Sequence, residues 1–144
     1  MARSTTPEEN KRLARRYPED VATEGDIHLI DTICTEDVVE HSPLGERRGT
    51  EALKEQSEYI HAAFPDVSVT IEDVVAEGDT VAQRLTFRGT HQGEFMGIEP
   101  TDNELEIANT LFTRVEDGHI AERWLLIDTL GLLQQLGAVD PPGE

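Results

Sequence analysis

The sequence contains a single cysteine, Cys34, only two lysines and no long hydrophobic run. One cysteine excludes an internal disulfide framework and a zinc site built from several cysteines. No stretch approaches the roughly 18 consecutive apolar residues of a membrane-spanning helix. Residues 1–16 lack the apolar segment of a secretory signal. We therefore expect a soluble, cytoplasmic protein that forms one domain over residues 1–144.

Positive charge is also scarce, because 30 acidic residues stand against 12 basic ones and the net charge is −18. Such a chain repels nucleic acids and anionic membranes, so we expect neither as a partner. The acidic residues are spread among periodic apolar ones, which excludes an acidic disordered tail. Self-repulsion of this size destabilises a compact state unless salt screens it, which favours the high-salt cytoplasm of a halophilic microbe.

The first half of the chain is predicted to be helical. The segment Thr6-Pro7-Glu8-Glu9 has the residues of a capping box with proline at the first helical position. Pro18 then removes a helical hydrogen bond, so we expect a kink or a short break there. Asp26 is expected to cap a second short helix, and a third helix begins at Gly49-Thr50 and ends before Pro65.

From Val67 onward the apolar period changes from 3.6 to 2. Two strands with a turn at residues 77–79 are predicted, followed by a glycine-rich connection. A second hairpin is predicted over residues 104–115 and 119–127. Helices followed by strands predict an α+β fold with an antiparallel sheet and helices packed on one face. A parallel pairing in the central sheet would contradict this expectation.

The register of the second hairpin depends on how the chain turns at Asp117-Gly118. A three-residue loop, residues 116–118, places Leu111, Arg123 and Leu125 on one face. A two-residue turn shifts the pairing by one, so that Glu122, Trp124 and Asp128 share a face with Asn109 instead. The sequence alone leaves both registers open.

Two segments together resemble the SnoaL-like polyketide or ester cyclase family, within the superfamily named after nuclear transport factor 2. They are VAQRLTFRGTHQGEFMGIEPT, residues 81–101, and RVEDGHIAERWLLIDTLGLLQQLG, residues 114–137. The resemblance implies a cone-shaped domain, in which a curved antiparallel sheet surrounds a pocket that helices close, and often a dimer. It also implies cofactor-free acid/base chemistry, in which removal of a proton beside a carbonyl closes a ring of a polyketide ester. The resemblance favours the first register.

The same resemblance identifies two positions that carry proton transfer in the family's cyclases. A histidine there stands three residues before the arginine of R-x-x-D-G, and an aspartate stands seven residues after the glycine. This chain has Leu111 and Leu125 at those positions. Leucine neither accepts nor delivers a proton, so the family's mechanism does not carry over residue by residue.

Two other titratable residues are candidates for catalysis. His41 lies at the end of a short extended segment, where it is either a general base at the pocket mouth or a histidine hydrogen-bonded at a strand end. Asp128 is either a base or the N-cap of the last helix. No histidine–carboxylate spacing indicates a metal site.

The candidate ligand-binding residues lie on the predicted strands and the glycine-rich connection. Arg84 and Arg123 either pair with acidic residues or bind an anionic group of a ligand. His91 either fixes its loop or takes part in catalysis. The full candidate set is Arg84, His91, Asn109, Leu111, Arg123 and Leu125.

Three functional classes stay open. The first is a cofactor-free lyase or isomerase acting on a small apolar carbonyl compound or ester, with His41, Asn109 or Asp128 replacing the missing pair. The second is a non-catalytic module that binds a small apolar ligand, and the third is a purely structural dimer. Because Phe112, Trp124 and Leu126 share the second sheet face in the favoured register, we expect a homodimer that covers them.

Overall fold

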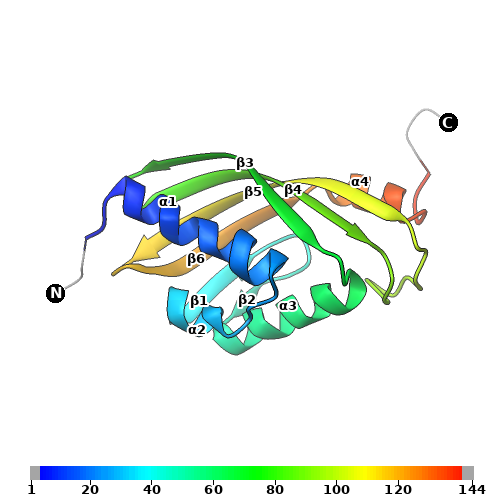
Figure 1. Ribbon diagram of the computed structural model, residues 1–144, viewed down its shortest axis with the longest axis horizontal. Coiled ribbons are helices and arrows are strands. Elements are labelled where there is room, and N and C mark those ends of the chain that lie inside the picture. Colours follow the sequence, from blue (N-terminus) through cyan, green and yellow to red (C-terminus); the bar gives the residue numbers. More distant parts are fainter. Residues whose placement is uncertain (1–3, 141–144) are drawn as a thin grey trace.

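A computed structural model describes residues 4–140 of the chain. Six strands form one curved sheet in the order β2-β1-β6-β5-β4-β3, and helices cover its concave face (Figure 1). The helical elements are α1 (Pro7–Arg16), η1 (Tyr17–Thr23), α2 (Leu29–Ile33), α3 (Thr50–Ala63) and α4 (Thr129–Gln135). The strands are β1 (Cys34–His41), β2 (Arg47–Arg48), β3 (Ser68–Glu77), β4 (Thr80–Thr90), β5 (Glu104–Glu116) and β6 (His119–Ile127). The predicted α+β cone with helices on one sheet face is confirmed.

The predicted capping box at the start of α1 is present. The Thr6 hydroxyl accepts a hydrogen bond from the Glu9 amide at 3.1 Å, and the Glu9 carboxylate accepts one from the Thr6 amide at 3.0 Å. The α-helix is interrupted beside Pro18, as expected, because it gives way at Tyr17 to the π-helical segment η1. Proline has no N–H to continue the ladder, and the wider turn keeps Tyr17 and Val21 buried.

The predicted cap of the second helix is wrong. Helix α2 begins at Leu29, and the preceding His28 makes no side-chain cap bond. Asp26 contributes its backbone carbonyl instead, which accepts from the Leu29 amide at 3.2 Å. The third helix follows the prediction, with Gly49 at φ 88° before the first turn.

One pairing contradicts the expected fully antiparallel sheet. Strand β1 runs parallel to β6, with Glu40 opposite Arg123 and His41 opposite Trp124. Parallel neighbours need a long crossover rather than a tight turn, and the chain between β1 and β6 includes α3 and the strands β3–β5. The sequence pattern indicated an extended segment that ends at His41, but no local turn signal specified its partner strand.

The β5–β6 hairpin combines the two registers that the sequence left open. Asp117 and Gly118 have φ values of 52° and 76°, as in a two-residue type I′ turn, with Glu116 opposite His119. The register then shifts between Arg114 and Val115, which leaves Ala121 as an extra residue on β6. This β-bulge places odd-numbered residues of both strands on one face, as a three-residue loop would, although the residues paired differ: Leu111 lies opposite Leu125.

The bulge decides which side chains of β6 face the helices. Beyond it, Arg123 is buried, whereas Trp124 and Leu126 are exposed on the other face. Opposite them on β5, Leu111 and Thr113 are buried and Phe112 is exposed. A two-residue turn without the bulge would have turned Glu122 and Trp124 inward.

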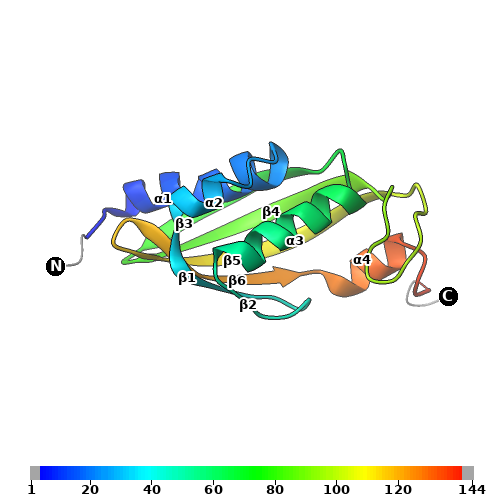
Figure 2. The same ribbon diagram turned by 90° about the horizontal axis from the view of Figure 1, so that it is seen from below.

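Helices α1 and α3 lie over the same face of the sheet (Figure 2). Two apolar clusters fill the space between helices and sheet. One joins α1, η1, α2 and α3 to β1 and β6, and includes Tyr17, Ile30 and Val38. The other joins the end of α3, the strands β4 and β5 and helix α4, around Phe64. Within residues 4–140, no helix has the length and apolar character needed to cross a bilayer.

Candidate functional site

A cavity of about 140 Å³ lies between the helices and the concave face of the sheet. Its walls are largely apolar, and three aromatic rings, Phe64, Phe87 and Phe95, form part of them. The Phe64 ring meets the other two edge-on, at centroid distances of 5.3 Å to Phe87 and 5.2 Å to Phe95. This packing fixes the wall without filling the cavity, which suits an apolar ligand.

A buried ion pair lies in the cavity wall, on the neighbouring strands β1 and β6. Glu40 and Arg123 are 4% and 5% exposed, and their side chains form a direct salt bridge. Both residues line the cavity. The pair exists because β1 runs parallel to β6 with Glu40 opposite Arg123, and because the Ala121 bulge turns Arg123 inward.

Tyr17 of η1 packs on the same guanidinium. The Arg123 guanidinium carbon lies 3.5 Å from the centroid of the Tyr17 ring, a close cation–π contact. Burial raises the pKa of the Tyr17 hydroxyl well above its usual value, and the positive charge of Arg123 opposes this only in part. Tyr17 therefore stays neutral, and its ring holds the guanidinium in place.

Two residues of the cavity lining each have one buried polar atom without a protein partner. The Nε–H of Arg123 and the Oδ1 atom of Asn109 are both buried without a protein partner. Asn109 lies on β5 and lines the same cavity. A buried donor and a buried acceptor without partners cost free energy, and a bound ligand or water can satisfy them. In the β5–β6 register Asn109 lies opposite Ile127, four residues along β5 from the partner of Arg123, so the two atoms are separate polar points of the lining.

Helix α3 adds a titratable side chain to the wall. His61 lines the cavity, and its Nε2 atom lies 3.4 Å from the carbonyl oxygen of Val21 in η1. A carbonyl only accepts, so this contact requires the proton on Nε2 and leaves Nδ1 as the basic nitrogen of the neutral ring.

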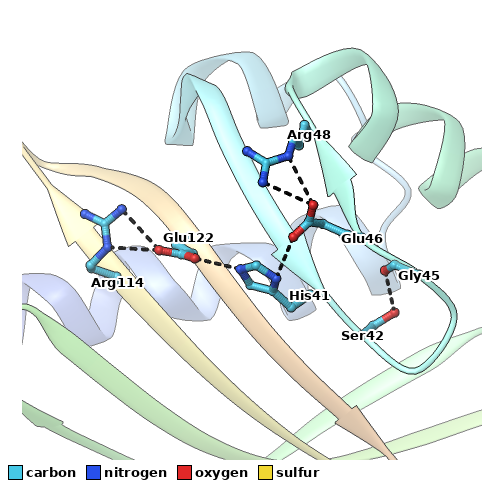
Figure 3. A network of polar contacts seen from close by, with 7 residues as sticks. All are labelled: His41, Ser42, Gly45, Glu46, Arg48, Arg114 and Glu122. Atoms are coloured by element: carbon cyan, nitrogen blue, oxygen red, sulfur yellow. Dashed lines mark hydrogen bonds and ion pairs between the residues drawn. The ribbon is translucent and has the colours of Figure 1, made fainter.

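His41 lies outside the cavity lining, in a polar network between β1 and β6 (Figure 3). Its Nε2 is 2.6 Å from the Glu122 carboxylate, and its Nδ1 is 3.1 Å from the Glu46 carboxylate. Its ring stacks on Trp124 at a centroid distance of 5.7 Å. The hydrogen bond from His41 lowers the pKa of Glu122. His41 is thus a histidine hydrogen-bonded at a strand end, and any catalytic role for it stays a prediction.

Asp128 caps helix α4. Its side chain accepts a hydrogen bond from the Gly131 amide at 3.0 Å, as expected of an N-cap residue. A Cβ at Gly131 would lie 2.4 Å from an Asp128 carboxylate oxygen, so the cap requires glycine there. Asp128 is also absent from the cavity lining, and its catalytic role is likewise untested.

Two further candidates do not reach the cavity. Arg84 is exposed on the opposite face and pairs with Asp73 at 2.7 Å. His91 is fully buried, and its Nδ1 contacts the Thr101 hydroxyl at 3.0 Å and accepts from the Thr101 amide at 3.2 Å. These bonds connect the two ends of the loop between β4 and β5, so the structure gives His91 a loop-fixing position.

The remaining candidates lie on the concave face. Asn109, Arg123 and Leu125 line the cavity. Leu111 lies directly opposite Leu125 in the β5–β6 register and is 1% exposed, but it does not line the cavity. Among residues 4–140, no cluster of three histidine, cysteine or acidic side chains is placed to hold a metal ion.

Sequence reasoning missed Glu40, Tyr17 and His61 as cavity residues. For Glu40 a signal was present, because Val38 and Glu40 are two apart on a strand and therefore share a face. For Tyr17, the helical spacing with Leu13 and Val21 indicates an inward side chain but no contact with Arg123. No local pattern distinguished His61 from a solvent-facing histidine.

Comparison with known sequences and structures matches this geometry to one family. The family model described as SnoaL-like polyketide cyclase matches residues 11–136. A comparison with curated proteins finds no match.

Three solved structures illustrate the likeness. AclR from Streptomyces galilaeus, named a putative hydroxylase, is 29% identical with a TM-score of 0.84, over 96% of this chain and 87% of that one. IdmH from Streptomyces antibioticus, named a putative polyketide cyclase, is 31% identical with a TM-score of 0.77, over 89% and 98%. A putative polyketide cyclase from Bacillus cereus is 33% identical with a TM-score of 0.77, over 91% and 82%.

Proposed function

The chain belongs to the SnoaL-like polyketide cyclase family, and we propose that it is a cofactor-free acid/base enzyme acting on a small, largely apolar carbonyl compound. The observation that carries this proposal is the buried Glu40–Arg123 pair in the wall of an otherwise apolar cavity. Burying two charges is costly even when they are paired, so the ion pair is a poor device for stability alone. Perturbed or buried charges in a cavity are typical of functional sites.

The proposed chemistry is proton abstraction beside the carbonyl. The Glu40 carboxylate takes the proton, the electron pair of the C–H bond forms the carbon–carbon double bond, and the carbonyl oxygen becomes the enolate oxygen. Arg123, oriented by the Tyr17 ring, stabilises that oxygen electrostatically. The protonated Glu40 then returns its proton at the same or another atom, which completes an exchange or an isomerisation.

Proton exchange tests this proposal without knowledge of the natural substrate. We expect the protein to accelerate deuterium incorporation beside the carbonyl of cyclohexanone or methyl phenylacetate in D₂O, followed by NMR. Glu40→Gln keeps the shape and one hydrogen bond but cannot accept the proton, so the accelerated rate should fall by about 100-fold or more. Thermal denaturation of each variant confirms that it is folded.

Arginine variants give a matched control. Arg84→Gln removes an exposed arginine of the opposite face and should leave exchange unchanged. Arg123→Gln removes the cavity arginine and should slow it. If the wild-type protein does not accelerate exchange at all, or if Glu40→Gln is as active as the wild type, acid/base catalysis through Glu40 is wrong.

One observation favours a second candidate function, a non-catalytic module that binds a small apolar ligand. In this chain, Leu111 and Leu125 stand at the two positions that the resemblance assigns to proton transfer in the family's cyclases. Leu125 adds apolar surface to the cavity. Under this alternative, Leu125→Trp fills the cavity and abolishes binding, while neither Glu40→Gln nor the wild type shows turnover. Calorimetric titration with the same compounds separates binding from exchange.

A further inference from the structure

A second arginine lies beside the buried ion pair, on the edge strand of the sheet. Strand β2 pairs with β1 so that Arg47 lies directly opposite Glu40, while Arg123 lies opposite Glu40 on β6. Residues that face each other on neighbouring strands project from the same side of a sheet. The three side chains therefore form one row on the concave face, with a carboxylate between two guanidinium groups.

Arg47 has no bond of its own in this row. Its Nη1 atom is buried without a hydrogen-bond partner, and Arg47 forms no ion pair with any of residues 4–140. Its charge nevertheless reaches the cluster. Burial raises the pKa of the Tyr17 hydroxyl, and the charges of Arg123 and Arg47 both oppose that rise. A buried cationic atom without a partner is a poor device for stability, which points to a role for the charge itself.

The other titratable groups around Glu40 do not balance the two arginines. Burial raises the pKa of the Cys34 thiol to about 12, so Cys34 stays neutral, as Tyr17 does. On α2 and α3, which pack on β1, Asp31 and Lys54 pair with each other. The buried row thus holds two cations and one anion, in a chain whose net charge is −18.

We infer that Arg47 is a positioning residue that keeps the Glu40 carboxylate ionised inside the protein, by supplying a second positive charge on the side away from the cavity. The inference rests on the proposed function for the role of Glu40 as the base. Burial favours the neutral form of a carboxyl group, and neighbouring cations oppose that preference. Arg123 lines the cavity, whereas Arg47 does not. Arg47 therefore acts on the carboxylate more than on the enolate oxygen, which Arg123 stabilises.

Loss of this second charge would change the base in two opposite ways. Glu40 would be protonated more often at low pH, where it then cannot accept a proton, and it would be a stronger base once ionised. Proton exchange should then be slower than in the wild type at low pH and no slower at high pH. A residue that only supports the fold would slow exchange at every pH.

Deuterium exchange into cyclohexanone between pH 5 and pH 9 tests this behaviour. We expect Arg47→Gln to be slower than the wild type by at least about threefold at pH 5 and no slower at pH 9. Arg47→Lys keeps the charge and should follow the wild-type profile. Arg48→Gln is the matched control, because Arg48 is the next residue of β2, is exposed and pairs with Glu46. Its profile should match that of the wild type.

His61 requires a separate control, because it is the remaining titratable residue among those that line the cavity. Histidine ordinarily changes charge between pH 5 and 8. The same profiles are therefore measured in a His61→Gln background, in which the effect of Arg47→Gln should persist. If Arg47→Gln slows exchange by the same factor at pH 5 and pH 9, or if its effect disappears in that background, the inference is wrong.

Melting temperatures test the same charge interaction without catalysis. At pH 7, Arg47→Gln should lower the melting temperature of the wild-type protein. It should lower it less, or raise it, in a Glu40→Gln background, where the two arginines only repel each other. Equal shifts in the two backgrounds overturn the inference. If Arg47→Gln does not fold, Arg47→Met, which keeps an apolar stem, takes its place.

The two measurements separate this inference from the proposed function. Unequal melting shifts without accelerated exchange leave the role of Arg47 standing and refute the enzyme. Exchange that depends on Glu40, together with equal melting shifts and a profile that Arg47→Gln leaves unchanged, does the reverse.

Discussion

Leu111 and Leu125 lie directly opposite each other on β5 and β6, on the concave face that forms the cavity wall. The resemblance to the SnoaL-like cyclases implies that these two positions carry the proton-transferring histidine and aspartate in that family. Next to this pair, Gln83 lies opposite Leu111 on β4, and neither side-chain polar atom of Gln83 has a partner among the described residues. The local geometry therefore keeps the two positions within reach of each other, with a buried amide beside them.

This arrangement predicts that the double change Leu111→His and Leu125→Asp restores proton transfer. The sharpest background is Glu40→Gln, because it removes the proposed base of the wild-type protein. We expect the triple variant to regain deuterium exchange into methyl phenylacetate by at least about tenfold over Glu40→Gln, because a positioned acid/base pair contributes 10²–10⁴-fold. Leu125→Asp alone serves as the control and should regain little. A folded triple variant that stays inert would show that the cavity cannot position the pair.

A second prediction concerns pH and the contact between His41 and Glu122. The His41 hydrogen bond lowers the pKa of Glu122 below its ordinary value of 4.5. The interaction therefore stabilises the fold above about pH 4.5, and this contribution is lost as pH falls through the lowered folded-state pKa. His41→Ala should reduce the free energy of unfolding by about 1 kcal/mol at pH 6 and by much less at pH 3.

Urea denaturation at both pH values measures this difference. His119→Ala is the matched control, because His119 is exposed and its Nδ1 atom contacts a backbone carbonyl, that of Asp117, rather than a carboxylate. If His41→Ala reduced the free energy of unfolding equally at pH 6 and pH 3, the stabilising contact would be the packing of His41 on Trp124 rather than the bond to Glu122.

The sequence predicted the helices and strands of this fold better than it predicted which strands pair with each other. The strands of the β5–β6 hairpin and the capping box of α1 depend on neighbouring residues, so local patterns were sufficient for them. The parallel β1–β6 pairing joins distant segments, and no local signal specified it. The bulge at Ala121 also escaped prediction, because alternation alone cannot show where a strand gains one residue.

The site follows the same division between local patterns, which the sequence shows, and non-local contacts, which it does not. Asn109 and Leu125 were placed correctly on the concave face because strand alternation fixes the face once the register is known. Glu40 was missed because its importance comes from its partner Arg123 on a non-local neighbour. His41 was considered for the pocket mouth, but the parallel register sets it opposite Trp124, whose side chain is exposed on the outer face.

A third prediction concerns salt. A net charge of −18 on 144 residues produces repulsion that mobile ions screen. We expect the melting temperature to rise steeply between dilute buffer and molar potassium chloride, as in a protein suited to a high-salt cytoplasm. Calorimetry at several potassium chloride concentrations measures this. A melting temperature that stays flat over the range would remove the argument for a halophilic source.

The last prediction concerns association through the outer sheet face. One row of the sheet pairs Val75 with Ala82, then Phe112, Trp124 and His41 across five strands. In this row Val75, Phe112 and Trp124 are 63%, 46% and 41% exposed, and Leu126 beside them is 66% exposed. An apolar row of this kind is costly to leave in water, so we expect a homodimer that covers it with Trp124 near the centre.

Light scattering at micromolar concentration measures this association. Trp124→Glu should convert the dimer to a monomer, because it places a charge at the centre of the buried area. Met96→Glu is the matched control: Met96 is 42% exposed and lies in the loop between β4 and β5, away from the row. That variant should remain dimeric. A wild-type protein that is already monomeric at this concentration, or a Trp124→Glu variant that stays dimeric, rules out the outer face as the interface.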